Sequence, residues 1–450
     1  MELWNEKATF SHSSPVLKDA DVVVCGAGPA GVAAATMCGR QGLRTLLIEK
    51  NGFCGGAAVA GLSGTICGLF LGQKDIEKKE PKQIVHGFVD EFAQRLLAKN
   101  GLTAPQIYGK THVLTFDPFC WREAADDLLQ EANVSVLFHT LVTEVSKKDD
   151  KLTAIRIESS AGHSYITAKA FIDCTGDAAL IAKSGHEFSY GDNGAIQNPT
   201  MMFRVGNVDS ASFYEYFGSD TICPDDCTQK LSEAYRKGTY KTPRDRVWIF
   251  PTPQDSIFLM NCTQLAGQHG EMLNVINPED RTYAEISGRR AAREYHRFFK
   301  ENIPAFKNSQ LIDMAPEVGV RQTRTIKGEK LLSNEHVVNC TKCNDGIVRS
   351  SWPIELHAGD VSKLMWLIND YYEVPYGTLV PQGLDNVIVA GRSLSAEHEA
   401  LASSRVTAQC FEYGHAAAVA TALSFENKCN YRDVDIDELR KRMIANGSSL

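Results

Sequence analysis

Three glycines near the start of the chain have the spacing that lets a backbone come close to phosphate groups. They are Gly26, Gly28 and Gly31, between an apolar run at 22–24 and an alanine-rich stretch. The first permits a tight turn, the second lets the backbone approach a pyrophosphate, and the third lets a helix pack closely on a strand. Pro29 and Ala30 begin that helix, whose N-terminal N–H groups can bind phosphate oxygens. The spacing predicts a dinucleotide-binding turn.

An acidic residue, Glu49, ends the next apolar strand at 45–48, 18 residues after Gly31. A carboxylate at this position can accept hydrogen bonds from ribose hydroxyls and would repel a 2′-phosphate, which argues against NADP. Glycine motifs also mark ordinary turns, but strand, helix, strand and terminal acid together are specific. These residues alone leave the choice between FAD and NAD open.

A double glycine follows the acid in the stretch that contains Lys50, Gly55, Gly56 and Ala57. Here the chain resembles the FAD-dependent oxidoreductases of the glutathione-reductase-like superfamily, in which such glycines pass along the cofactor. Segments 319–329 and 374–381 resemble signatures of a bacterial FAD-dependent oxidoreductase family, and 386–400 resembles its second flavin-binding segment. The resemblance extends from residue 20 to about 422 and implies FAD as the cofactor.

The resemblance also implies further cofactor contacts in the second half of the chain. A strand ending in Thr-Gly returns to the flavin in this superfamily, and another backbone segment holds the adenine. A helix beginning near 402–405 would point its N-terminal N–H groups at the flavin and stabilise the anionic reduced ring. The positions that carry these roles are Val142, Thr175, Gly176, Gly391, Arg392 and Ser404.

Five residues are candidates for chemistry or substrate binding. His398 could act as a general acid or base near the flavin, or be a loop histidine bonded to backbone. Arg321 and Arg324 would share one face of a helix, where they could hold a substrate carboxylate or tie two domains together. Tyr376 could contact substrate or pack in the core, and His357 could line the mouth of the active site.

These features predict an FAD-dependent oxidoreductase that acts on a small organic substrate by hydride transfer at flavin N5. No second glycine motif is present to hold NAD(P)H as in disulfide reductases, so the external electron donor or acceptor is left open. The alternatives are a flavin-dependent monooxygenase or halogenase, whose motifs are missing, and a flavin-binding electron-transfer subunit of a larger complex.

Composition is that of a large acidic enzyme. The 450 residues are 43% hydrophobic and 23% charged, with a net charge of −8, and no basic run suggests nucleic acid. We expect no membrane span and no secretory signal, and the odd count of 13 cysteines favours the reducing cytoplasm. Cys340 and Cys343 have the spacing of a zinc or redox pair, but without a matching second pair we interpret them as loop cysteines and expect no metal.

The predicted fold class is α/β. A Rossmann-like FAD-binding domain with a central parallel sheet would carry an inserted α+β substrate domain. The N-terminal arm would lie on the surface or across a neighbouring subunit, which makes a homodimer plausible. The predicted parts are an arm at 1–19, a first FAD-binding part at 20–195 with a helical excursion at about 73–132, a substrate-covering insertion at 196–317, a second FAD-binding part at 318–425 and a tail at 426–450.

Overall fold

The central sheet of the computed structural model, which describes residues 16–358 and 361–450, is built from short apolar strands. Strands β1, β2, β6, β9 and β20 run parallel to their neighbours, and their buried residues are mainly valine, leucine and isoleucine, as expected for strands covered on both faces. Strands β7 and β8 extend the sheet in antiparallel pairing from the first half of β9. The bounds are β1 (Val16–Cys25), β2 (Thr45–Ile48), β6 (Ser135–Leu137), β7 (Leu141–Lys148), β8 (Lys151–Ser159), β9 (Gly162–Asp173) and β20 (Val387–Val389).

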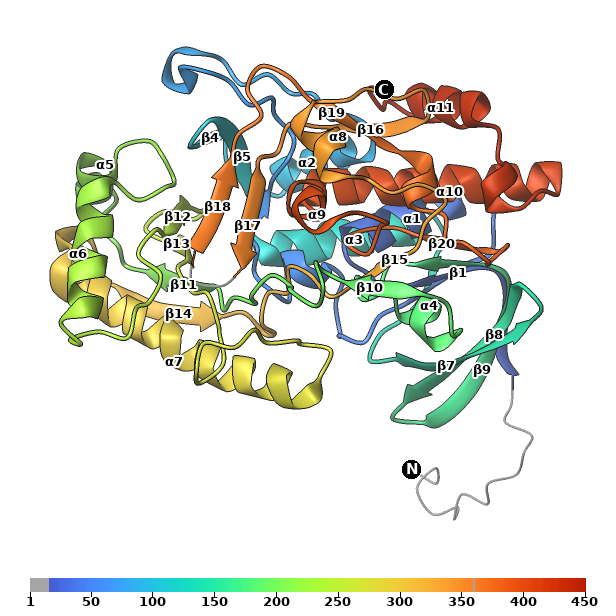
Figure 1. Cartoon of the computed structure of the whole chain (residues 1–450), viewed down its shortest axis with the longest axis horizontal. Helices are drawn as coiled ribbons and strands as arrows, with labels where there is room; N and C mark the ends of the chain where they lie inside the picture. The colour runs from blue at the N-terminus through green and yellow to red at the C-terminus, as the bar shows by residue number, and fades with distance from the viewer. Residues whose placement is uncertain (1–15, 359–360) are drawn as a thin grey trace.

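Two helices rich in small residues pack on each other, and the first of them also packs on this sheet. They are α1 (Pro29–Arg40) and α10 (Thr407–Asn427), which lie together in the right-hand half of Figure 1. A Cβ atom on Gly414 would come within 2.0 Å of the carbonyl oxygen of Ala30, so the two backbones are in direct contact there. The neighbouring helices are α2 (Phe88–Ala98), α3 (Pro118–Glu131), α4 (Ala179–Lys183) and α11 (Ile436–Ala445).

A second, antiparallel sheet lies at the other end of the molecule, on the left of Figure 1. Its four strands follow the order β12-β13-β11-β14, and the long helix α7 runs beside it. All of its elements fall within 196–317, the stretch expected to form the insertion. They are β11 (Phe203–Gly206), α5 (Ser210–Phe217), α6 (Asp225–Arg236), β12 (Trp248–Pro251), β13 (Phe258–Asn261), α7 (Pro278–Asn302) and β14 (Gln310–Met314).

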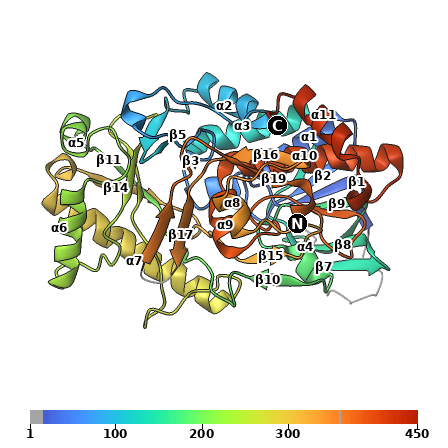
Figure 2. The ribbon, with the colours of Figure 1, turned by 45° about the horizontal axis from the view of Figure 1, so that its top comes forward.

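Short strands and helices fill the space between the two sheets. The hairpin of β17 and β18 stands between them in Figure 2, and the rings of Trp248 and His357 lie 6.3 Å apart across this boundary. The remaining strands and α-helices of the described chain are β3 (Thr65–Ile66), β4 (Gln106–Tyr108), β5 (Thr111–Thr115), β10 (Phe188–Tyr190), β15 (Arg324–Ile326), α8 (Asn334–Val338), β16 (Gly346–Ser350), β17 (Ile354–Ala358), β18 (Val361–Met365), β19 (Tyr372–Pro375) and α9 (His398–Ser404).

The structure differs from the sequence expectations in three local features. Residues 16–19 of the expected arm are the beginning of β1 and pair with β9, while 1–15 lie outside the described residues. The segment around Arg321 and Arg324 is extended rather than helical, because residues 324–326 form a strand paired with β10. The tail at 426–450 contains α11, which packs on α10. No helix in the described part of the chain is long and apolar enough to cross a membrane.

Candidate functional site

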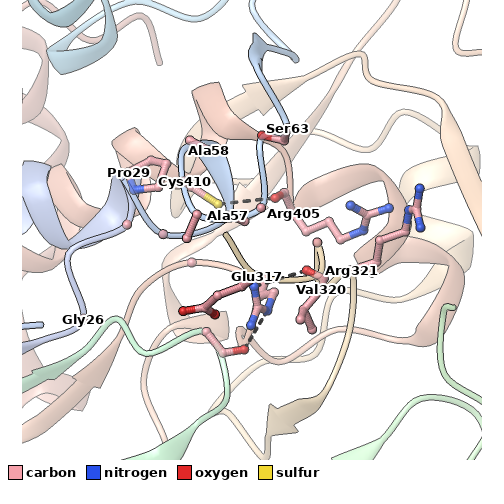
Figure 3. Close-up of a pocket in the computed structure, with 18 of the residues that line it drawn as sticks. Gly26, Pro29, Ala57, Ala58, Ser63, Glu317, Val320, Arg321, Arg405 and Cys410 are labelled. Atoms are coloured by element: carbon pink, nitrogen blue, oxygen red, sulfur yellow. Dashed lines mark hydrogen bonds between the residues drawn. The ribbon is translucent and has the colours of Figure 1, made fainter. Parts of the chain in front are cut away.

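One continuous cavity runs from the carboxyl ends of the central parallel strands to the β17 hairpin and the second sheet. Its first half is lined by the glycine turn after β1, the residues after β2, the double-glycine loop and the ends of β9 and β20. Its second half is lined by residues of β4, β12, β13 and β17 and of the chain around 318–321. In open α/β sheets, ligands bind at the carboxyl ends of the strands, where the first half of this cavity lies. The close-up in Figure 3 shows the cavity with Gly26 of the glycine turn, Ala57 of the double-glycine loop and Arg321 of the 318–321 segment.

The three glycines of the turn have different structural roles. Gly26 has a φ of +98°, and a Cβ there would lie 2.5 Å from the carbonyl oxygen of Cys174. A Cβ on Gly31 would lie 1.8 Å from the carbonyl oxygen of Gly26, so both positions are required by the packing of the protein itself. Gly28, which lines the cavity, has no atom closer than 3.9 Å to the place of a Cβ. The open space at Gly28 is what a pyrophosphate needs, and Pro29 and Ala30 line the same wall at the start of α1.

Glu49 lies at the end of β2 and lines the cavity, as predicted. Its carboxylate is buried and accepts hydrogen bonds from the backbone N–H groups of Ala27 (2.8 Å) and Asn51 (2.9 Å). Burial raises the pKa of Glu49 above its usual value. Lys50 also lines the cavity, and its Nζ lies 2.7 Å from the carboxylate of Glu317. Glu49 thus has a structural role in the turn in addition to the ribose contact that we predict for it.

The double-glycine loop approaches the glycine turn directly. Gly55 lies behind the cavity wall, with a φ of +134° and an N–H that donates to the carbonyl of Ala27 at 2.7 Å. Gly56, with a φ of +49°, and Ala57 line the cavity. Val142 lines the cavity near the antiparallel edge of the sheet, where we predicted the adenine contact.

Arg392 joins three segments of the cavity wall. Its guanidinium donates to the carbonyl of Gly176 (2.9 Å), to the carboxylate of Asp177 (2.9 Å) and to the carbonyl of Val320 (3.2 Å). Burial alone would raise the pKa of Asp177, but the charge of Arg392 and the hydrogen bonds from Thr323 and Arg392 together outweigh it, and the net shift is downward. The predicted residues Thr175, Gly176, Gly391 and Arg392 all line the cavity.

The helix whose N-terminus reaches the cavity begins later than predicted. Ser404 is the last residue of α9 and is fully buried, and its carbonyl accepts a hydrogen bond from the hydroxyl of Tyr413. Val406 and Thr407, at the start of α10, line the cavity instead. The helix N-terminus that we expected at Ala402–Arg405 is therefore that of α10, because the chain turns between the two helices, and the N–H of Ala408 there donates to the carbonyl of Cys67 at 3.0 Å.

Two of the three predicted catalytic residues lie away from the cavity. Tyr376 is buried in the core, where its hydroxyl donates to the carbonyl of Tyr431 at 2.9 Å. His398 begins α9, is half-buried beside Gly191 and does not line the cavity, and burial lowers its pKa. Arg324 also lies outside, with its guanidinium over the ring of Phe188. Arg321 is the predicted catalytic residue that the structure places in the cavity wall.

The second half of the cavity contains polar residues that sequence reasoning missed. Tyr108, Glu355 and Arg405 line it together with Arg321 and His357, although they come from β4, β17 and the turn before α10. No spacing in the chain links these positions, and a charged residue within a strand such as β17 is the one local signal that could have drawn attention to Glu355. Cys340 and Cys343 do not line the cavity, and all thirteen cysteines are free thiols.

Comparison with known proteins is consistent with this geometry. A family model described as FAD dependent oxidoreductase matches residues 21–443. Thiamine thiazole synthase of Methanococcus maripaludis (strain C5) is 27% identical over 184 residues, which are 39% of this chain and 63% of that protein, so the chain spans less than two thirds of this curated relative. The crystal structure of p-nitrophenol 4-monooxygenase PnpA from Pseudomonas putida DLL-E4 superposes with a TM-score of 0.50 at 12% identity, covering 95% of this chain and 86% of that one.

A geranylgeranyl bacteriochlorophyll reductase-like protein from Thermoplasma acidophilum is also similar, with a TM-score of 0.49 at 16% identity over 95% of this chain and 83% of that chain. The family match covers nearly the whole chain, and it agrees with the open space at Gly28 and the glycine-lined wall that a dinucleotide requires. The chain belongs to the FAD dependent oxidoreductase family and is an enzyme that binds FAD.

Proposed function

We propose that this enzyme oxidises or reduces a small organic substrate by hydride transfer at flavin N5, with the substrate in the second half of the cavity. The observation that carries the proposal is the continuity of the cavity from the glycine turn to Arg321, Glu355 and Trp352. When bound, FAD supplies the two-electron redox chemistry. A substrate in the second half would therefore share one enclosed space with the cofactor.

The chain's own residues would bind, orient and shield the substrate. Tyr108, Phe250 and Trp352 line the second half and are almost completely buried, so they exclude water from it. The positive N-terminal end of the α10 dipole would favour negative charge near it, which suits a reduced flavin. Arg392, Asp177 and Gly176 would hold the wall between the two halves through their mutual hydrogen bonds.

The test begins with the visible absorption spectrum of the purified enzyme before and after acid precipitation. Release of FAD into the supernatant would establish a non-covalent flavin. Candidate substrates are then added in the absence of oxygen. If the enzyme oxidises the substrate, the flavin becomes reduced and its absorption bands should bleach. For the reverse direction, the flavin is first reduced chemically, and return of the bands on addition of substrate is expected.

Two outcomes would favour the alternatives. Incorporation of labelled oxygen into product would indicate a monooxygenase. An FAD-loaded protein that turns over no substrate but co-purifies with a redox partner would indicate an electron-transfer subunit.

A further inference from the structure

The second half of the cavity contains more positive than negative charge, and this surplus points to the substrate class of the proposed function, on which the inference rests. Arg321 is 7% exposed and donates one hydrogen bond, from Nη1 to the carbonyl of Asn198 at 2.7 Å. Arg405 donates from Nη2 to the side-chain oxygen of Gln197 at 3.0 Å, and its Nε has no hydrogen-bond partner among the described residues. Both guanidiniums therefore have N–H donors that make no hydrogen bond to the described part of the protein.

A third guanidinium lies behind these two. Arg244 is 7% exposed and sits 4.4 Å from the ring centre of Trp248. Its Nη1 donates to Asn261 and Thr263, while Nε and Nη2 have no partner in the described part of the chain. Burial and the neighbouring charges of Arg244 and Arg405 lower the pKa of Arg321 to about 9, which still leaves it protonated at neutral pH.

Among the residues that the structure describes, one carboxylate, that of Glu355, interacts with these three cations. Its Oε1 accepts hydrogen bonds from the hydroxyl of Tyr108 (2.8 Å) and from Nε2 of His357 (3.0 Å). Burial would raise the pKa of Glu355, but the bond from His357 and the nearby positive charges outweigh it and lower the pKa to about 2. Burial and the charge of Arg321 lower the pKa of His357 to about 3, so the imidazole is neutral at pH 7. Within the described part of the chain, three cations and one anion leave two positive charges in excess.

The other described acidic residues that line the cavity are engaged elsewhere, and Glu49 accepts hydrogen bonds from the backbone of Ala27 and Asn51. Glu317 is paired with Lys50 at 2.7 Å and with Arg281 at 2.5 Å, and Asp177 is paired with Arg392 at 2.9 Å. Buried like charges without a counter-ion are unfavourable, and an anion that accepts hydrogen bonds from them relieves this cost. The planar guanidinium fork matches a carboxylate in a bidentate manner.

An apolar wall stands next to the charged group. The rings of Tyr108 and Trp352 have centres 5.0 Å apart, and those of Tyr108 and Phe250 are stacked with centres 6.2 Å apart. All three side chains line the cavity. Such rings bind a flat or unsaturated apolar group better than a hydrated polar one.

We infer that the substrate is an organic carboxylate with a flat apolar body, held by its carboxylate between Arg321 and Arg405 and by its body against Tyr108, Phe250 and Trp352. The cofactor's phosphates do not explain these arginines, because the glycine turn that suits phosphate lies elsewhere in the cavity. In Figure 3, Gly26 and Pro29 lie on one side of the cavity, and the guanidiniums of Arg321 and Arg405 lie on the other.

The inference is tested by direct binding to the FAD-loaded enzyme, with benzoate and benzamide as probes. The two have the same shape and differ in charge, so their difference reports on charge recognition. Binding is followed by tryptophan fluorescence, since Trp352 lines the site, and by perturbation of the flavin absorption bands. We expect benzoate to bind at least about tenfold more tightly than benzamide, as the strength of charge-assisted hydrogen bonds implies.

Arg321→Met and Arg405→Met should each weaken benzoate binding about tenfold or more while leaving benzamide binding unchanged. Arg204→Met is the matched control, because Arg204 is a half-buried arginine of β11 that pairs with Asp313 at 2.6 Å and does not line the cavity. This control should bind benzoate as the wild type does. Arg321→Lys keeps the charge but loses the fork, and it replaces the methionine variant if that variant does not fold.

Three results would overturn the inference. They are equal binding of benzoate and benzamide by the wild type, binding of neither, and wild-type benzoate affinity in both arginine variants. Each leaves the proposed function standing as long as the enzyme holds FAD and its flavin bands respond to some uncharged substrate. Failure of the proposed function would instead show itself as a flavin that no substrate reduces or reoxidises.

Discussion

Substitution of Gly28 by valine is expected to weaken cofactor binding while leaving folding nearly unchanged. Apart from its chain neighbours, the nearest protein atom to a Cβ at this position is Cα of Gly56, at 3.9 Å, so a Cβ has room and we expect the rest of the isopropyl side chain to extend into the cavity that Gly28 lines. Its φ of −70° is available to any residue. We expect the cofactor-free variant to unfold within about 1 kcal/mol of the cofactor-free wild type, since the only cost is a poorer helix N-cap.

The same isopropyl group would occupy space that the pyrophosphate requires. Overpacking costs about 1 to 3 kcal/mol, and displacing the phosphate from one backbone N–H loses about 1.5 to 3 kcal/mol more. The sum of about 2.5 to 6 kcal/mol corresponds to about 10² to 10⁴ weaker FAD binding. Flavin content after purification and a titration of cofactor-free protein with FAD, followed by fluorescence, measure this loss.

Gly31→Ala is the contrasting variant. Its Cβ would lie 1.8 Å from the carbonyl oxygen of Gly26, so helix and strand must separate, and we expect a loss of about 1 to 3 kcal/mol or more in unfolding free energy even without FAD. Wild-type FAD affinity in Gly28→Val would refute the assignment of this space to the pyrophosphate. A cofactor-free Gly28→Val protein as unstable as Gly31→Ala would show that the side chain meets protein rather than open cavity.

Three further predictions concern individual side chains. Glu49→Ala should weaken FAD binding by about 1 to 3 kcal/mol, through loss of bonds to a charged group; a calorimetric titration that shows unchanged affinity would mean that Glu49 serves only the backbone bonds to Ala27 and Asn51. His398→Ala should leave both flavin content and turnover unchanged, because His398 does not line the cavity, and a slowed half-reaction with FAD fully bound would contradict this placement. Burial and the charge of Arg321 lower the pKa of His357 to about 3 in the folded protein. Below about pH 6.5 the unfolded chain therefore binds more protons at this histidine than the folded protein does. The free energy of unfolding should fall as the pH drops from about 7 to about 5, by up to about 1.4 kcal/mol per pH unit. In urea unfolding, the free energy of unfolding of His357→Gln should depend less steeply on pH than that of the wild type. Identical slopes would refute the lowered pKa of His357 as the cause of this pH dependence.

The local order of residues in the sequence was sufficient to predict the glycine turn and the acidic residue that line the first half of the cavity. Gly26, Gly28, Gly31 and Glu49 lie within one strand–helix–strand unit, where each role follows from positions a few residues apart. The unit forms as predicted, with α1 at Pro29–Arg40 and β2 at Thr45–Ile48. The long helix α7 is likewise a local feature, because helical periodicity is a property of the nearby chain.

Only the tertiary structure decided which residues line the second half of the cavity. Tyr108, Phe250, Arg321, Glu355 and Arg405 are separated by tens of residues, and they meet because the β17 hairpin and the second sheet close over the flavin-binding domain. Tyr376 and Ser404 are the opposite case. The resemblance predicted that they lie at the site, whereas in the folded chain both are buried in the core. Periodicity and spacing encode what neighbours in the chain do together, whereas the charge surplus around Arg321 arises from groups that come together only when the chain has folded.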